Sequence, residues 1–354
     1  MILLQQIELY PVNILQIVFA FTAAFGALLI WNQDRYRGLA NFFIYLAALM
    51  LLNLLEETQV TREFYLITPI FTLLHGPLIY FFIRTLVNDK SLSTIPSYSH
   101  FIAMFLALPF TEHVQQVVAV GTVSQIIYLV ISFQLLRRYH VASMAMRSDA
   151  DSLTLTWVFK ILTIFTIFAF VDLVRLNLQT ENSIMVSASW YFFDLLIFFS
   201  ISCFLLYKAF RQPILFDGMT SYEESEKHPV KSNEQSDIDT AKSVFDDIEN
   251  IILRDKLYNK PRLSITDISN QTGLNIKDIS WAINLGCNRN FCEYINGLRV
   301  KEVQQKILDD QQNSTPLLNL AYESGFNSKS TFNAVFKNEV GMTPTQFLRS
   351  NQSH

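Results

Sequence analysis

Residues 317–347 read LLNLAYESGFNSKSTFNAVFKNEVGMTPTQF, and this stretch predicts two helices joined by a tight turn. Gly325 stands at the turn, where a residue without a side chain lets the backbone reverse sharply. Phe332 and Phe336 are four residues apart, so they share one face of the second helix and can be buried together. The pattern is typical of a helix-turn-helix unit.

The ends of these helices are also marked in the sequence. Thr315 and Pro316 predict the start of the first helix, with a capping hydroxyl followed by proline at the first helical position. Gly341 predicts the end of the second. The second helix carries polar side chains that we expect to face a DNA groove or its phosphates, because asparagine can pair with adenine and lysine or serine can contact either base or phosphate. These candidates are Lys329, Ser330, Asn333 and Lys337.

A second unit of the same kind is predicted upstream, at about 264–284. Ser264 and Asp267 have the spacing of a capping box, Gly273 supplies the turn, and Asn275 caps a helix over 276–284. Its groove-facing candidates are Lys277, Ser280 and Asn284. An amphipathic helix from Asp237 precedes this unit, and a long helix over 290–308 connects it to the tail unit.

The run GFNSKSTFNAVFKNEVGMTP at 325–344 resembles the AraC-type DNA-binding domain, which consists of two helix-turn-helix units joined by a linker helix. The run FCEYINGLRVKEVQQKIL at 291–308 is similar to that linker helix. The resemblance covers roughly 237–348 and implies a bacterial transcription regulator whose partner is double-stranded DNA. It also implies that helices 276–284 and 328–337 enter successive major-groove segments, about 34 Å apart.

The remainder of the chain is too apolar for an ordinary soluble protein. The whole chain of 354 residues is 51% hydrophobic and 16% charged, with 30 Phe, and the apolar residues are concentrated upstream of the tail. Seven largely uncharged segments precede residue 208: 11–31, 39–55, 64–87, 95–110, 114–136, 153–176 and 187–207. A membrane-spanning helix needs about 20 apolar residues, with about 17 tolerated. We therefore predict a seven-helix transmembrane bundle, in which segment 95–110 is the shortest.

Basic residues predict the orientation of this bundle. With the N-terminus outside, the cytoplasmic connections hold nine of them: Arg35, Arg37, Arg84, Lys90, Arg137, Arg138, Arg147, Lys208 and Arg211. The opposite side holds Arg62 and, at a span end, Arg175. Seven spans then place the C-terminal domain in the cytoplasm, where DNA is. The expected location is the bacterial cytoplasmic (inner) membrane.

Ionisable residues inside the spans are candidates for signal sensing, because charges in a bilayer are costly and often functional. These are His75, Asp172, Arg175 and Asp194. Asp172 and Arg175 are three residues apart on one helical face, so a structural ion pair is an alternative, with Asp194 as a further partner. A ligand or proton site remains the other interpretation.

Together these patterns predict an all-α protein with three parts: a seven-helix transmembrane sensor domain (1–212), a flexible polar linker (213–236) and a cytoplasmic tandem helix-turn-helix domain (237–354). The predicted function is membrane-bound, one-component transcription regulation in response to an unknown signal ligand. A homodimer is inferred from this function alone. No metal-ligand spacing, cofactor motif or catalytic motif is visible, so an enzyme is not expected.

Two other functions are alternatives to a transcription regulator. One is a membrane transporter with a regulatory tail, although no internal repeat of the kind common in transporters is visible. The other is a receptor whose tail mediates protein–protein contacts. The latter is motivated by a thin basic charge, since residues 250–354 hold 12 Lys and Arg against 9 Asp and Glu.

Overall fold

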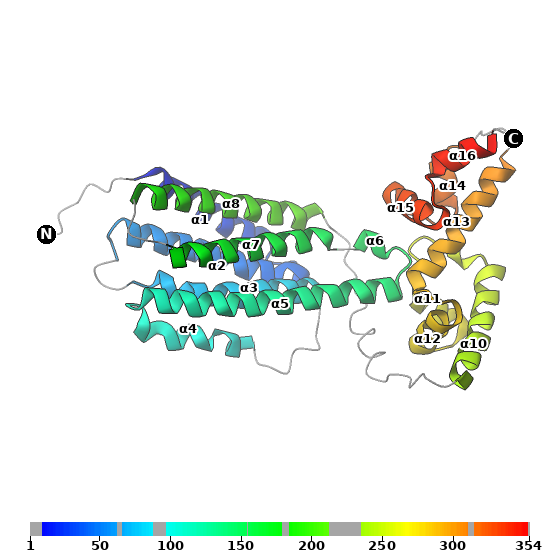
Figure 1. The fold of residues 1–354 in the computed structure, drawn as a ribbon, viewed down its shortest axis with the longest axis horizontal. Coiled ribbons are helices and arrows are strands. Elements are labelled where there is room, and N and C mark those ends of the chain that lie inside the picture. Colours follow the sequence, from blue (N-terminus) through cyan, green and yellow to red (C-terminus); the bar gives the residue numbers. More distant parts are fainter. Residues whose placement is uncertain are drawn as a thin grey trace. The chain divides into compact units, whose positions relative to one another are not determined.

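The computed structural model describes residues 9–61, 66–87, 97–153, 155–178, 184–211, 235–310 and 315–352 (Figure 1). Within these ranges the chain is helical, and its one β-type pairing is an isolated antiparallel bridge between Arg147 and Ser264. The predicted all-α fold is therefore confirmed. The chain forms two compact units, one from Met1–Arg137 and Leu155–Leu215, the other from Arg138–Thr154 and Phe216–His354.

The first unit is a bundle of apolar helices. They are α1 (Pro11–Ile30), α2 (Arg37–Glu57), α3 (Thr68–Val87), α4 (Ile102–Ala107), the first part of α5 (Val114–Met146), α7 (Thr156–Leu178) and α8 (Ile184–Arg211), with the short 3-10 turns η1 (Asp34–Tyr36), η2 (Ser97–Phe101) and η3 (Leu108–Phe110). The long helices lie side by side (Figure 1). α2 packs against both α1 and α3, and α8 packs on α1.

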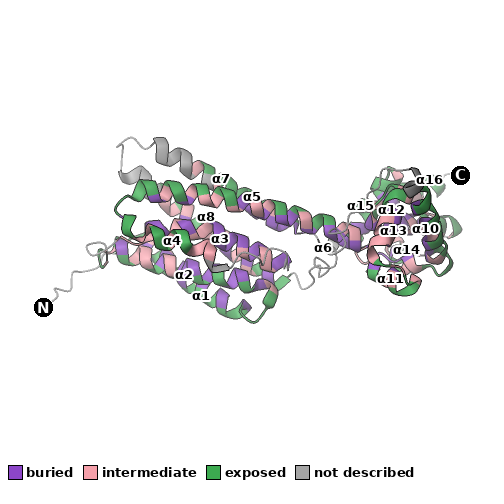
Figure 2. Cartoon of the chain, turned by 90° about the horizontal axis from the view of Figure 1, so that it is seen from below, coloured by how far each residue is buried: buried purple, intermediate pink, exposed green. Residues whose placement is uncertain are grey.

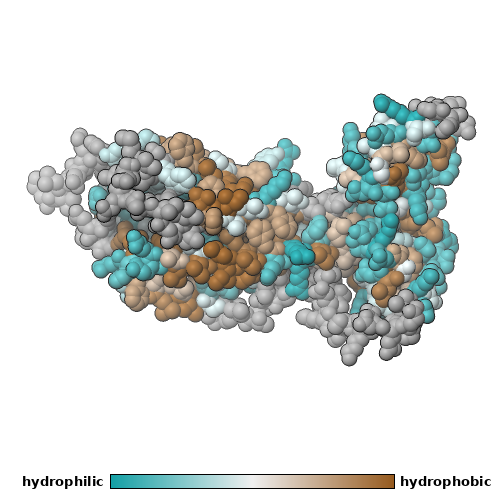
Figure 3. All heavy atoms as spheres, in the orientation of Figure 1, coloured by the Kyte–Doolittle hydropathy of each residue, from teal (hydrophilic) through white to brown (hydrophobic). Residues whose placement is uncertain are grey.

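Large apolar side chains cover much of the outer surface of this bundle. Phe21 is 72% exposed and Leu28 73% exposed. Exposed positions run along the outer faces of the bundle helices (Figure 2), and hydrophobic atoms gather over the middle of the bundle surface (Figure 3). Contiguous apolar surface of this kind is unfavourable in water and suits contact with lipid. Five helices among the described residues are long and apolar enough to cross a membrane: Pro11–Ile30, Asp34–Glu57, Thr68–Val87, Val114–Met146 and Trp190–Arg211.

Segment 95–110 forms the shorter apolar stretch Ser99–Phe110. Segment 153–176 forms α7, whose apolar part with described side chains is Thr156–Phe168, because the side chains of 169 and 172–178 lie outside the described residues. Segment 95–110 changes from α4, which ends at Ala107, to the 3-10 turn η3, which begins at Leu108 and contains Pro109. Leu108 keeps α-region dihedral angles, but Pro109 has no backbone N–H, so the α-helical hydrogen-bond pattern cannot continue through it. Five helices of spanning length are thus found among the described residues, and the predicted number of seven spans is not confirmed.

A close approach of α3 and α5 shapes the middle of the bundle. A Cβ atom placed on Gly121 would lie 2.3 Å from the Thr72 hydroxyl oxygen, so only glycine permits this spacing. Pro77 lies inside α3, where it removes a backbone hydrogen bond. Both features fall next to the cavity described below.

The second unit holds the helices predicted at the C-terminal end. They are α10 (Gln235–Arg254), the 3-10 turn η4 (Leu257–Asn259), α11 (Ile265–Thr272), α12 (Ile276–Cys287), α13 (Phe291–Asp309), α14 (Leu317–Glu323), α15 (Lys329–Val340) and α16 (Pro344–Gln352). The unit also includes the end of α5 from Arg138 and the short helix α6 (Ala150–Leu153). Of the predicted linker 213–236, residues 213–234 lie outside the described residues.

Local capping explains most of these boundaries. Ser264 and Asp267 form the predicted capping box of α11, and Asn290 and Glu293 form a second capping box at the start of α13. The Asn275 side chain accepts from the Asp278 backbone N–H at 2.8 Å and so starts α12. One boundary differs, since Pro316 is the N-cap of α14 rather than its first helical residue.

The tail unit packs around the predicted aromatic pair. The Phe332 and Phe336 rings meet edge to face at 5.7 Å, and Phe326 and Phe347 extend the stack. Buried aliphatic side chains of α13 and α14 complete this core, among them Val303, Ile307 and Leu320. The linker helix α13 is therefore part of the second unit's core, where it packs against the buried face of α15.

Candidate nucleic-acid interface and bundle cavity

The four candidates on α15 form one exposed surface. Lys329, Ser330, Asn333 and Lys337 are all exposed, whereas Phe332 and Phe336 on the opposite side are buried. Ser328 caps the helix by accepting from the Thr331 backbone N–H at 3.1 Å. The first turn of α15 is thus fixed, and its polar face is presented to solvent.

The candidates on α12 also share a face, but they are less accessible. Asn284 is exposed, while Lys277 and Ser280 are half-buried. Trp281 lies on the same face, and its indole nitrogen is buried without a hydrogen-bond partner among the described residues. Asp278 is engaged in capping, because its carboxylate accepts from the Asn275 side-chain amide. The Asp278 carboxylate therefore takes part in capping α12 and is not one of the side chains expected to face the DNA groove.

Three lysines on these two helices carry positive charge that no ion pair within the described part of the chain uses. Several other basic groups of the domain have acidic partners, as in the pairs Lys260–Asp267 at 2.6 Å and Arg289–Glu339 at 2.9 Å. By contrast, Lys277, Lys329 and Lys337 pair with no carboxylate among the described residues. Although basic residues only slightly outnumber acidic ones in the DNA-binding domain, both candidate helices thus have lysines that can bind DNA phosphates.

The core of this unit contains one buried cation, Arg299 on α13. Only 2% of it is exposed, and burial lowers the pKa of its guanidinium to about 10. That value still leaves the group charged at neutral pH. Its Nε donates to the Tyr258 carbonyl at 2.7 Å, and one Nη donates to the Lys260 carbonyl at 2.9 Å. A buried charge needs such partners, so Arg299 fixes the η4 turn against α13.

The arrangement of α11 to α16 is that of two helix-turn-helix units on a linker helix. Residues 268–350 match the family model of a helix-turn-helix domain of the AraC type. This match runs from α11 to α16, and it assigns DNA binding in transcription regulation, not an enzymatic role, to the domain. No curated protein and no solved structure matches the chain.

The first unit contains a polar cavity of about 220 Å³ among its helices. Two of the predicted sensing residues, His75 and Asp194, line it together with Asn53, Gln125 and Tyr191. The Tyr45 hydroxyl and His75 Nδ1 are hydrogen-bonded at 2.7 Å. The side chains of Asp172 and Arg175 lie outside the described residues, so the ion pair between them stays a prediction.

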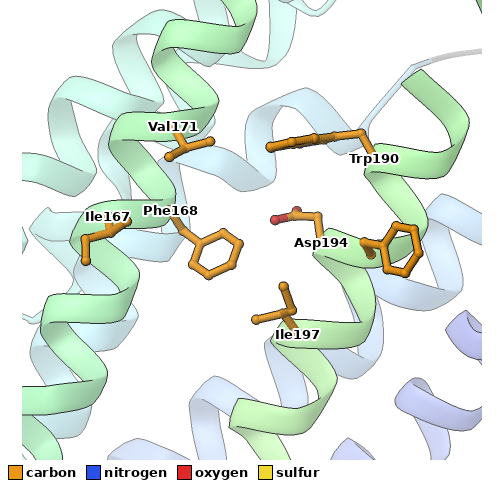
Figure 4. A pocket seen from close by; sticks show the side chains of 7 residues that line it. Ile167, Phe168, Val171, Trp190, Asp194 and Ile197 are labelled. Carbon is orange, nitrogen blue, oxygen red and sulfur yellow. The ribbon is translucent and has the colours of Figure 1, made fainter. Parts of the chain in front are cut away.

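Asp194 also borders a second, apolar cavity of about 260 Å³. In Figure 4 its carboxylate points into the space between the two helices that line this cavity, α7 and α8. The other lining side chains are Ile167, Phe168, Val171, Trp190, Phe193 and Ile197. A single carboxylate therefore lies where a polar cavity and an apolar one meet.

A partly buried hydrogen-bond cluster next to the polar cavity was not predicted. The Glu57 carboxylate accepts from Asn13 at 2.8 Å and from Gln16 at 2.9 Å, and Gln16 also donates to the Tyr191 hydroxyl at 3.0 Å. Isolated carboxamides in an apolar helix give little signal in a sequence. Among the described residues no group of His, Cys, Asp and Glu side chains is arranged to hold a metal ion.

Proposed function

We propose that this chain is a membrane-anchored, one-component transcription regulator that binds operator DNA directly. The observation that carries the proposal is the exposed, unpaired row Lys329, Asn333 and Lys337 on α15, within a domain of the AraC type. The same chain carries five helices apolar and long enough to span a bilayer. A signal received by the membrane part then acts on transcription without a separate kinase.

DNA binding is tested with the full chain in lipid nanodiscs. Rounds of selection from a random-sequence DNA pool yield the preferred fragment, and a mobility shift then measures its affinity. We expect one selected motif with two elements about one helical turn apart, since two recognition helices would read successive major-groove segments. Recovery of unselected sequences alone would favour the receptor with a protein-binding tail.

The membrane orientation is part of the proposal: seven crossings, with the N-terminus outside and the DNA-binding domain in the cytoplasm. We expect a membrane-impermeant thiol reagent to label Gln59→Cys in intact cells but to label Gln33→Cys only after the cells are opened. These two residues flank α2 at opposite ends, so each serves as the control for the other. Labelling of Gln33→Cys alone in intact cells would invert the topology.

We further propose that the paired cavities bind the signal, a small molecule with a hydrogen-bond-donating or cationic group beside an apolar body. The donor group would meet Asp194 and the apolar part would fill the space lined by Phe168 and Trp190. Ligand pockets commonly combine apolar walls with a few polar groups that fix orientation.

A medium-chain alkylamine is a suitable probe of this site. We expect it to raise the thermal midpoint of the protein in nanodiscs more than the alcohol of equal length does, because binding to the folded state stabilises it. Asp194→Asn should remove the difference between amine and alcohol. Ser200→Ala, a change at an exposed position on the same helix, should preserve it. Equal midpoints with amine and alcohol in the wild type would contradict the assignment.

A further inference from the structure

The segment Arg147–Asp149, which follows α5, is built into the second unit. The Ser148 backbone N–H donates to the Leu263 carbonyl at 2.9 Å, and Arg147 forms the antiparallel bridge with Ser264. Ser148 is fully buried and Asp149 is 3% exposed. A connection that was only solvated would leave a serine and an aspartate accessible to water.

The linker helix α13 supplies the site that receives Ser148. One Nη of Arg299 donates to the Ser148 hydroxyl at 3.0 Å, and the other is 3.5 Å from the Ser148 carbonyl. The Asn296 side-chain amide donates to the same carbonyl at 3.1 Å. The hydroxyl and carbonyl oxygens of the buried Ser148 thus both accept hydrogen bonds from side chains of α13, as buried polar groups require.

The segment also touches both helix-turn-helix units. Leu263 and Ser264 immediately precede α11, the first helix of the upstream unit. On the other side, the Asn327 amide lies 3.4 Å from the Asp149 carboxylate, and Asn327 precedes the cap of α15. The Asp149 carboxylate is held in turn by Arg147 at 2.9 Å. Ser148 is thus hydrogen-bonded to the start of the upstream helix-turn-helix unit and to the linker helix α13, and Asp149 is hydrogen-bonded to the turn of the tail unit.

We propose that Arg147–Asp149 is an intramolecular ligand of the DNA-binding domain and that its docking holds the two recognition helices in the arrangement that binds DNA. The segment directly follows the part of α5 that belongs to the second unit, while α5 up to Arg137 and all of α7 belong to the bundle, so a movement of either helix in the bundle would withdraw the segment. Withdrawal of the segment removes Ser148 as an acceptor for the buried Arg299 guanidinium. It also removes the hydrogen bonds through which the segment connects the two helix-turn-helix units. The regulatory part of this inference rests on the proposed function.

A bulky substitution in the segment tests the inference without altering the DNA-binding helices. Ser148→Trp cannot fit a fully buried serine site, whereas Val141→Trp places the same side chain at a 48% exposed position on α5, seven residues before Ser148. In nanodiscs we expect Ser148→Trp to weaken binding to the selected DNA fragment at least about tenfold, within the usual range of coupling between sites. Val141→Trp should bind as the wild type does.

Hydrogen exchange in the same samples reports docking independently of DNA. Ser148→Trp should raise exchange at the backbone amides of 258–264 and 325–328, and Val141→Trp should not. If wild type and Ser148→Trp show equal exchange and equal affinity, the docked segment has no such role. If the wild type selects no DNA, the proposed function fails, and the exchange result still decides whether the segment docks.

A disulfide lock gives the opposite perturbation. Directly opposed residues of an antiparallel pair have Cα atoms about 4.5–5.5 Å apart, which suits a disulfide. Arg147→Cys combined with Ser264→Cys should, when oxidised, bind the fragment at least as tightly as its reduced form, with each single variant as control. A locked protein that loses DNA binding would overturn the proposal, because the docked state would then be the inactive one.

Discussion

Replacing Lys329, Asn333 and Lys337 together with alanine is expected to abolish sequence-specific DNA binding by the full chain. A bidentate contact of asparagine to adenine contributes about 1–3 kcal/mol of discrimination. Each lysine that neutralises a phosphate adds a further, salt-dependent contribution. We expect the affinity for the selected fragment to fall by at least about a hundredfold, since about 1.4 kcal/mol corresponds to a factor of ten.

The single variants separate the roles of these residues. Asn333→Ala should relax the preference at one base position, while Lys337→Ala should weaken all sequences alike and reduce the salt slope by about 1. Lys301→Ala is the matched control, because Lys301 is exposed in the same domain but lies on α13, outside both recognition helices. Unchanged affinity of the triple variant in a mobility shift would contradict the assignment of α15.

The second large effect is expected for Gly325→Ala, at the turn between α14 and α15. Gly325 has φ +90°, and a Cβ atom there would lie 2.4 Å from the Tyr258 carbonyl oxygen and 2.8 Å from Arg299 Nε. The Tyr258 oxygen is the acceptor that Arg299 Nε uses, so the new methyl group would disturb the buried guanidinium as well. Overpacking of this kind costs about 1–3 kcal/mol. The positive φ adds about 1–2 kcal/mol.

Gly341→Ala provides a matched comparison. Gly341 has φ +80°, but nothing lies within 4 Å of the added Cβ atom, so Gly341→Ala has only the free-energy cost of the positive φ and no overpacking cost. We expect the thermal midpoint of the second unit to be lower in Gly325→Ala than in Gly341→Ala, by about 2–4 °C for each kcal/mol of additional destabilisation in a unit of this size. Proteolysis against temperature measures both midpoints. Equal midpoints would show that the turn does not pack on Tyr258 as described.

The DNA-binding domain could be predicted in detail because its helix ends are encoded locally. Ser264 and Asn275 each cap the helix that the sequence assigned to them, and Gly325 lies at the predicted turn with the required positive φ. Side-chain caps and glycine turns act over a few residues, so a sequence shows them directly. α12 extends to Cys287, three residues beyond the prediction, because Asn288 rather than Asn284 adopts the left-handed C-cap.

Contacts between distant segments were not visible in the sequence. Arg147–Asp149 is a short polar run that looks like any solvated connection, and its burial depends on Asn296 and Arg299, about 150 residues away. The hydrogen bonds of Glu57 with Asn13 and Gln16 were missed for the same reason. In the bundle, hydropathy identified apolar segments, but the break of the fourth at Pro109 depends on local backbone geometry.

The central claim is that one chain resides in the membrane and binds specific DNA. The most direct measurement isolates the membrane fraction by flotation from formaldehyde-treated cells that express the full chain, then sequences the DNA cross-linked to it. We predict discrete genomic sites that share one two-part motif and that disappear in the Lys329, Asn333 and Lys337 alanine variant. Identical DNA recovered with the wild type and with that variant would contradict the claim.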